Sequence, residues 1–390
     1  MKNGPHFAEP LQQVDRIFVR SKGRKLIYFG GCDYFRLSSH RTLLAALKRG
    51  LSRYGLSASA SRKTTGNHEV FEELELAAAR FFAAPHAILT STGFLTNLAV
   101  GQGLRGEVQR IFVDERSHAS LQDALRFVEA PVVPFQHRSP SDLKTKLGSV
   151  AKGERIAVVT DGIFAHNGAV APLSDYRKIV GRGALLWVDD AHGAGVMGAH
   201  GRGAVELSEL SRENLIQTVT FSKAFGAYGG AILCAEKMRS RIIAKSSAIA
   251  GSTPLPLPLA SAALAALNLL QHGTPLRARL FKNVQLFWAA CRKAEPEPAH
   301  DRAATRARRL GQARNSIVGL DPPEVPTPII AVCPPDARSL RRCLLQAGIH
   351  PPYICYPGGP QAGYFRFALS SEHTSEQVSH LAETLRAAQR

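Results

Sequence analysis

A lysine set among apolar residues is the first feature of this sequence that suggests chemistry. Lys223 lies in the stretch TVTFSKAFGAYGG, with Phe221 two positions before it and Ala224 and Phe225 directly after it. An apolar setting disfavours the charged ammonium, so it lowers the pKa of the amine and makes the amine a better nucleophile and base. The structural alternative is a side chain that reaches past its neighbours and keeps its ammonium in water.

Three other apolar runs end in carboxylate or imidazole side chains. They are VDDAHG (188–193) with Asp189 and His192, VDERSHAS (113–120) with Asp114 and His118, and TDGIFAHNG (160–168). Taken singly, such an aspartate is more often a helix cap than a catalyst, and such a histidine is more often structural. In an open α/β sheet, however, ligands bind at the carboxyl ends of the strands, so we expect these side chains to meet there.

A turn rich in small and hydroxyl residues, LTSTGF (89–94), precedes a predicted helix and could present backbone N–H groups to a phosphate. A lysine, two histidines, a carboxylate and a phosphate-type turn together describe a site for pyridoxal phosphate. In such sites the lysine forms a Schiff base with the cofactor, and the carboxylate keeps the pyridinium nitrogen protonated so that the ring acts as an electron sink.

The elements that would position these groups alternate along the chain. Helices are predicted at 41–55, where Leu43, Leu44, Leu47 and Leu51 share a stripe, and at 68–84. Short apolar strands are predicted at 87–90, 110–114, 155–161, 184–190, 216–221 and 230–235. Continuous apolar strands are typical of a buried, largely parallel sheet, and their alternation with helices indicates an α/β fold.

The pattern changes near residue 271, which predicts a second domain. A long helix, a Pro- and Arg-rich connector, a strand at 327–334, a helix at 336–348, a strand at 364–370 and a terminal helix follow in that order. We therefore expect an N-terminal segment at 1–40, a large α/β domain at 41–270 and a smaller α+β domain at 271–390. A chain of 390 residues is long enough for two such lobes.

Composition limits the setting and the partners. The six cysteines show no zinc-type spacing, so we expect no metal site and a reducing, cytoplasmic environment. The longest apolar run is too short to cross a membrane comfortably, and no signal peptide is recognisable. The net charge of +18 allows a solvated basic face, a polyanionic substrate or nucleic acid. Because no nucleic-acid motif accompanies the charge, a solvated face is favoured.

Four longer motifs carry a family resemblance. They are DERSHASLQDA (114–124), VTDGIFAHNGAVAPL (159–173), VDDAHGAGVMGAHGRGAVE (188–206) and TVTFSKAFGAYGGAILC (218–234). Together they resemble the α-oxoamine synthases, which are fold-type I pyridoxal phosphate enzymes. These enzymes condense an amino acid with an acyl thioester and release carbon dioxide. The resemblance implies a large domain with a mainly parallel seven-stranded sheet and a smaller C-terminal α+β domain.

The resemblance also implies the catalytic residues. Lys223 would be the Schiff-base lysine, and Asp189 would pair with the pyridinium nitrogen. His192 is similar to the histidine that hydrogen-bonds the cofactor's phenolic oxygen. His118 is similar to the histidine that stacks on the pyridine ring and contacts the substrate.

Further residues are implied at the phosphate and the substrate. Gly93 and Phe94 match the turn whose backbone holds the phosphate, and Thr220 matches a phosphate-binding threonine. Thr253 resembles a residue that reaches the phosphate of a neighbouring subunit, which implies a homodimer with active sites at the interface. Arg366 would hold the carboxylate of the amino acid, because a guanidinium binds both carboxylate oxygens at once.

The implied partners are an amino acid and an acyl thioester carried by coenzyme A or by an acidic carrier protein. Two alternatives stay open at this point. One is a related pyridoxal phosphate enzyme with another reaction type, such as an aminotransferase or a lyase-type acyltransferase. The other is a non-catalytic scaffold or regulatory protein on the same fold, which the retention of Lys223, Asp189 and His192 disfavours.

Departures from the family pattern lie on the substrate side. Cys32 replaces an asparagine, Phe71 replaces a histidine, and in ICYPGGP (354–360) Cys355 replaces an arginine and Gly358 a threonine. These changes fit either sequence drift in an ordinary family member or a specialised synthase with another acyl donor or amino acid. In the second case, we expect weaker recognition of an acyl chain that ends in a carboxylate.

Overall fold

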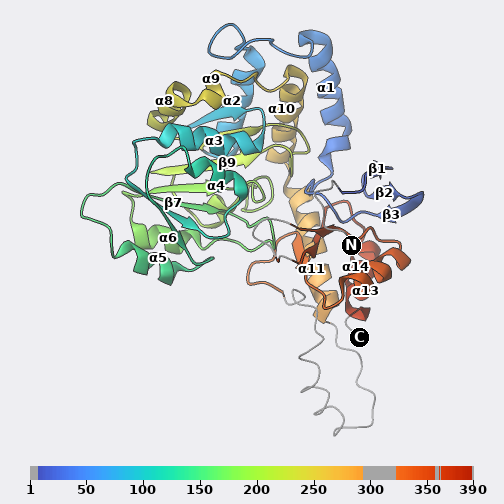
Figure 1. Ribbon diagram of the computed structural model, residues 1–390. Coiled ribbons are helices and arrows are strands. Elements are labelled where there is room, and N and C mark those ends of the chain that lie inside the picture. The colour runs from blue at the N-terminus through green and yellow to red at the C-terminus, as the bar shows by residue number, and fades with distance from the viewer. Residues whose placement is uncertain (1–7, 293–321, 356–359, 361, 389–390) are drawn as a thin grey trace. The chain divides into compact units, whose positions relative to one another are not determined.

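The computed structural model describes residues 8–292, 322–355, 360 and 362–388 (Figure 1). Their internal contacts divide the chain into two compact units. The larger unit is Cys32–Ala278, and the smaller one combines the described residues up to Gly31 with those from Arg279 onward. The boundaries 1–40, 41–270 and 271–390 stay a prediction.

A seven-stranded sheet lies at the centre of the larger unit. Its strands are, in order, β4 (His86–Thr90), β10 (Gly230–Cys234), β9 (Leu215–Thr220), β8 (Leu185–Asp189), β7 (Ile156–Asp161), β5 (Arg110–Asp114) and β6 (Val132–Phe135). Neighbouring strands from β9 to β6 pair in parallel, whereas β10 is antiparallel to both of its neighbours. The expected α/β fold with a mainly parallel sheet is confirmed.

Strand β6 is the one strand of this sheet that the sequence pattern did not predict. Its segment VVPF contains Pro134, which has no N–H to donate to a neighbouring strand. The strand is tolerated because it lies at the edge of the sheet and pairs with β5 alone. The other six strands agree with their predicted ranges to within one residue at each end.

The helices of the larger unit connect the strands and pack on the sheet. They are α1 (Arg41–Tyr54), α2 (Glu69–Phe81), α3 (Gly93–Leu104), α4 (Ala119–Leu125), α5 (Pro140–Leu147), α6 (Leu173–Val180), α7 (Ala204–Leu207), α8 (Glu236–Lys245), α9 (Ser247–Ala250) and α10 (Leu257–Gln271), with the 3₁₀ helix η1 at Leu37–Ser39. Helix α3 packs on β9 and β10 (Figure 1). It begins where β4 ends, so its N-terminus lies at one edge of the sheet.

The buried face of α1 differs from the predicted leucine stripe. Leu43 is buried, but Leu44 and Leu51 are each 43% exposed. The buried positions are Leu43, Ala46 and Gly50, because α1 packs closely against α10. A Cβ atom at Gly50 would lie 2.6 Å from the hydroxyl oxygen of Ser261, so this close approach requires small residues.

The smaller unit contains two antiparallel three-stranded sheets. One consists of β1 (Gln12–Gln13), β2 (Phe18–Ser21) and β3 (Arg24–Ile27), and the other has the order β11 (Ile329–Val332), β13 (Tyr364–Ala368) and β12 (Tyr353–Ile354). The helices are α13 (Ala337–Gln346), α14 (Ser375–Ala387) and most of α11 (Thr274–Arg292). Phe29 shares a core with residues of these helices and strands, among them Phe287, Ile330, Phe365 and Leu381. The N-terminal strands therefore belong to this α+β unit.

No helix in the described part of the chain combines the length and the apolar character that crossing a membrane requires.

Candidate active site

Side chains from separate segments meet at the carboxyl edge of the large sheet. Asp161 and Asp189 are register partners at the ends of β7 and β8, and Thr220 is the last residue of β9. Lys223 follows Thr220 by three residues. The structure thus brings together the lysine, carboxylate and threonine that the sequence placed after different strands. Within the described residues, no group of three His, Cys, Asp or Glu side chains is arranged to hold a metal ion.

Lys223 is in direct contact with His192. The Nζ atom of Lys223 lies 2.8 Å from Nε2 of His192, and Nδ1 of the same ring lies 2.8 Å from the hydroxyl oxygen of Tyr34. His192 and Tyr34 are buried, and Lys223 is half-buried. The sequence predicted the lysine and the histidine but missed Tyr34, because nothing in the spacing of CDYFRL points toward residue 192.

Asp189 is held by hydrogen bonds on both of its carboxylate oxygens. The side-chain amide of Asn97 donates to Oδ2 at 2.6 Å, and the backbone N–H of Ala191 donates to Oδ1 at 3.1 Å. Asn97 is itself fixed, since it donates to Ser120 Oγ and accepts from Thr218 Oγ1. Asn97 was missed by the sequence analysis, although a fully buried amide in the apolar helix α3 is a recognisable signal.

His118 lies at the N-terminus of α4 and accepts a hydrogen bond from the backbone N–H of Ser120. Burial lowers the pKa of His118, which favours the neutral ring, while the charge of Asp189 opposes this shift. The backbone N–H of His118 donates to Asp161 at 3.1 Å. Burial, together with the charge of Asp189, raises the pKa of Asp161 well above its usual range.

The N-terminus of α3 and the end of β9 form an anion-binding arrangement. Thr92 caps α3 by accepting from the N–H of Leu95, and the hydroxyl of Thr220 lies beside the first residue, Gly93. A Cβ atom at Gly93 would lie 2.8 Å from Thr220 Oγ1, so only glycine fits there. The hydroxyl groups of Thr220 and Ser222 are 2.8 Å apart. A helix N-terminus with adjacent hydroxyls suits a phosphate.

This donor set fits pyridoxal phosphate at each of its functional groups. A fixed carboxylate, Asp189, suits a protonated ring nitrogen, and the α3 N-terminus suits the phosphate. The amine of Lys223 and the imidazole of His192 lie in contact with each other, as a carbonyl and a phenolic oxygen on neighbouring ring carbons require.

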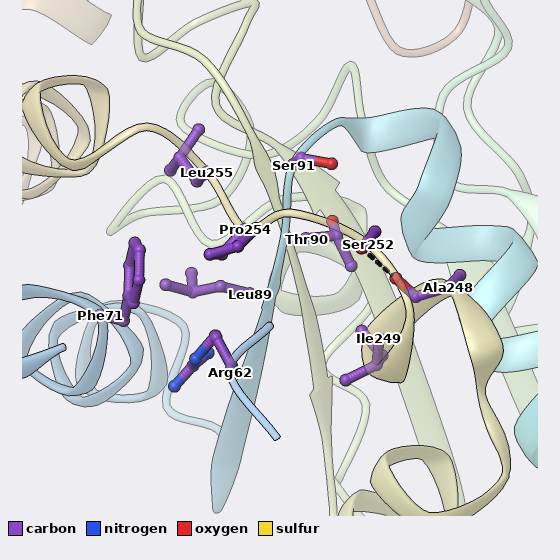
Figure 2. A pocket seen from close by; sticks show the side chains of 10 residues that line it. All are labelled: Arg62, Phe71, Leu89, Thr90, Ser91, Ala248, Ile249, Ser252, Pro254 and Leu255. Carbon is purple, nitrogen blue, oxygen red and sulfur yellow. Dashed lines mark hydrogen bonds between the residues drawn. The ribbon is translucent and has the colours of Figure 1, made fainter. Parts of the chain in front are cut away.

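A small cavity of about 20 Å³ lies beside the phosphate-type turn (Figure 2). Its lining includes Phe71, Leu89, Ser91, Pro254 and Leu255. Phe71 is fully buried, and the guanidinium of Arg62 lies over its ring while pairing with Glu75. The wall around Phe71 is therefore apolar, and the cavity is too small for a substrate chain.

The remaining sequence-predicted residues are placed as follows. Cys32 is half-buried, Thr253 is exposed in the segment between α9 and α10, and Phe94 is 44% exposed. Arg366 lies half-buried on β13, in the smaller unit. Gly358 lies outside the described residues. The roles assigned to these residues stay predictions.

Comparisons with known proteins agree over nearly the whole chain. The family model for aminotransferase class I and II matches residues 24–385. The 8-amino-7-oxononanoate synthase of Cronobacter sakazakii is 34% identical over 358 residues, which cover 92% of this chain and 88% of that protein.

Two solved structures extend the comparison. A serine palmitoyltransferase from S. paucimobilis with PLP and myriocin bound has a TM-score of 0.85 at 25% identity, covering 98% of this chain and 92% of that one. The 8-amino-7-oxononanoate synthase of Francisella tularensis has a TM-score of 0.73 at 27% identity, covering 93% and 97%.

Proposed function

Because the chain belongs to the aminotransferase class I and II family and, within it, to the α-oxoamine synthases, we propose that it condenses an amino acid with an acyl thioester. The products are carbon dioxide, a free thiol and an α-aminoketone, as in a reaction of the 8-amino-7-oxononanoate synthase type in biotin biosynthesis. The observation that carries the proposal is the contact between Lys223 and His192 beside a carboxylate and an anion-binding helix end.

Pyridoxal phosphate, when bound, supplies an electron sink that makes the α-proton of an amino acid acidic. Asp189 would hold a proton on the ring nitrogen, and Asn97 keeps the Asp189 carboxylate in one orientation. The backbone of Gly93 and Phe94 and the hydroxyl of Thr220 would hold the phosphate. These groups belong to rigid elements of one unit, so they are positioned before the cofactor binds.

Lys223 would remove the α-proton of the amino acid and return a proton to the product. This role needs a neutral amine in one step and an ammonium in the other, and the ring of His192 can accept from the ammonium or donate to the amine. His118, with its lowered pKa, would remain neutral and polarise the thioester carbonyl by donating a hydrogen bond.

We assign the amino-acid carboxylate to Arg366 and the neighbouring subunit's phosphate to Thr253, so the active protein would be a homodimer. The exposure of Thr253 supports this assignment, since a residue that reaches another subunit must be accessible in the single chain. Cys32 and Gly358 are the further substrate-side positions. We place the protein in the cytoplasm, where its free cysteines would stay reduced.

The donor's carrier, coenzyme A or an acidic carrier protein, is anionic, and the smaller unit offers a site that suits it. A cavity of about 210 Å³ lies between α13 and the β12–β13 hairpin, with Leu345, Tyr353 and Phe365 among its lining residues. Arg338, Arg341 and Arg342 also line it. In the described part of the chain, none of these three guanidinium groups pairs with a carboxylate. We propose that they attract the phosphate or carboxylate groups of the carrier.

A second candidate is a specialised synthase whose acyl donor is not a dicarboxylic acid. The specific observation in its favour is Phe71, which stands fully buried in an apolar wall where the family pattern has a histidine. Cys32 and Cys355 extend the loss of polar groups on the substrate side. The chemistry at Lys223 is the same for both candidates.

The test is to incubate the PLP-loaded protein with a panel of amino acids and acyl thioesters and to quantify three products. The proposed reaction releases carbon dioxide, free thiol and aminoketone in equal amounts. An aminotransferase would instead convert the amino acid to an oxo acid without thioester and without carbon dioxide. That outcome, or the absence of any reaction across the panel, would overturn the proposal.

A further inference from the structure

Tyr34 makes a contact that the proposed reaction has not yet used. Its hydroxyl oxygen lies 2.8 Å from Nδ1 of His192, while Nε2 of the same ring lies 2.8 Å from Nζ of Lys223. Both ring nitrogens of His192 therefore have polar partners, and Tyr34 and His192 are each at most 5% exposed. A buried imidazole with a partner on each nitrogen can serve only those proton arrangements that both partners accept.

Two proton arrangements are consistent with this geometry. When Lys223 is an ammonium, it donates to Nε2, so the ring proton of His192 sits on Nδ1 and is donated to the oxygen of Tyr34. When Lys223 is a neutral amine, Nε2 carries the ring proton and donates it to Nζ, and Nδ1 accepts from the Tyr34 hydroxyl. Only a group that both donates and accepts satisfies Nδ1 in the two states, and a phenolic hydroxyl is such a group.

We propose that Tyr34 is a positioning residue that allows His192 to exchange tautomers as Lys223 loses and regains its proton. The inference rests on the proposed function, which requires Lys223 to act as a base and then as an acid. Tyr34 touches only His192 in this argument, so its effect on Lys223 passes through the imidazole. The other ionisable groups that act electrostatically on Lys223 are His118 and Asp161, and Asp189 acts on both of these.

Replacing Tyr34 by Phe should lock His192 in one tautomer. Without the hydroxyl, a proton on Nδ1 would be a buried donor with no partner, which costs more than leaving the nitrogen lone pair unpaired. We therefore expect the Tyr34→Phe protein to keep the proton on Nε2 throughout. The matched control is Tyr176→Phe. Tyr176 is also fully buried, lies on α6, and has a hydroxyl with no partner among the described residues.

The first measurement follows the ¹⁵N chemical shifts of His192 in the full-length chain without cofactor, between about pH 7 and pH 10, the range in which amines titrate. The signal is assigned with His192→Gln. The wild-type and Tyr176→Phe proteins should pass from the Nδ1–H to the Nε2–H tautomer as pH rises, and Tyr34→Phe should show Nε2–H alone. A single tautomer in the wild type, or the same exchange in Tyr34→Phe, would overturn the proposal even if the reaction itself were different.

The second measurement is a double-mutant cycle on turnover by the PLP-loaded protein. We expect Tyr34→Phe to lower kcat about tenfold or more with little change in KM, because the loss falls on proton transfer rather than on binding. Adding Tyr34→Phe to His192→Gln should cost nothing further, since the glutamine cannot exchange tautomers. Additive losses would show that Tyr34 acts independently of His192. If the wild type showed no turnover, the proposed function would fail, whereas the tautomer measurement would still stand.

Discussion

The carboxylate of Asp189 and the side-chain amide of Asn97 lie 2.6 Å apart at the buried edge of the large sheet. Asn97 is on α3, four residues after Gly93, so both residues lie on the same side of this helix. One helix therefore supplies the anion-binding end of the candidate site and fixes the carboxylate at its other end. This arrangement couples the orientation of Asp189 to the position of the phosphate turn.

Replacing Asn97 by Asp should weaken cofactor binding. The new carboxylate would face Asp189 in a buried place, and mutual repulsion favours protonation of one of the pair, which removes the charge that a pyridinium nitrogen requires. We expect the Kd for PLP, measured by absorbance titration of the apo protein, to rise at least about tenfold. Gln109→Glu makes the same chemical change at an exposed position and should leave the Kd unchanged. Equal affinities would show that Asn97 does not act through Asp189.

Replacing Arg341 by Gln should raise the KM for an acyl-CoA donor. Removing one exposed, unpaired guanidinium from the cavity beside α13 weakens attraction of the donor's phosphates, and we expect a change of about threefold to tenfold that shrinks at high salt. Lys282→Gln removes one charge elsewhere on the same unit and is the control. A carrier-protein donor, and a short thioester without any carrier, should be compared. If only the carrier-protein KM rises, the anionic partner is a protein, and if none changes, the cavity is not the carrier site.

The free energy of unfolding should fall as pH rises through neutrality because of Asp190. Burial raises the pKa of this carboxyl from 3.8 to about 7. The folded chain thus holds the proton more tightly, so the stabilisation is complete below about pH 4 and lost as pH rises through 7. Between pH 5 and pH 8, Asp190→Asn should lose about 2 kcal/mol less than the wild type in chemical denaturation. Identical losses in the two proteins would contradict the raised pKa.

The apolar surroundings of Phe71 lead to a prediction about the acyl donor. A donor chain that ends in a carboxylate needs a polar partner, and burying a charge without one is costly. We therefore expect uncharged acyl thioesters of similar length to show about tenfold higher kcat/KM than pimeloyl thioester. Competition between the two donors in one reaction gives the ratio directly. A clear preference for pimeloyl would show that Phe71 does not set donor choice and would favour the 8-amino-7-oxononanoate reaction.

Much of this fold was predictable because its strands and helices carry periodic apolar patterns. Five strands of the parallel region and the residues that follow them were identified from the sequence, with β6 missed at a proline-containing edge. The buried face of α1 was predicted only in part, because the close packing of Gly50 against α10 decides it and periodicity does not.

The candidate site was predictable in its chemistry but not in its support. Lys223, Asp189 and His192 belong to types that declare themselves after apolar runs. Tyr34 and Asn97 act through hydrogen bonds that join segments 158 and 92 residues apart in the sequence, and no local pattern reports such a distance. The substrate residues are the least determined, since Arg366 belongs to the smaller unit and Gly358 lies outside the described residues.

The central claim is that Lys223 carries the chemistry of a decarboxylative condensation. It is tested most directly by measuring carbon dioxide, free thiol and aminoketone from an amino acid and an acyl thioester, with the PLP-loaded wild type, Lys223→Ala and the exposed control Lys178→Ala in parallel. We predict equal amounts of the three products from the wild type and the control, and none above background from Lys223→Ala. Turnover by Lys223→Ala at a rate near that of the wild type would contradict the assignment.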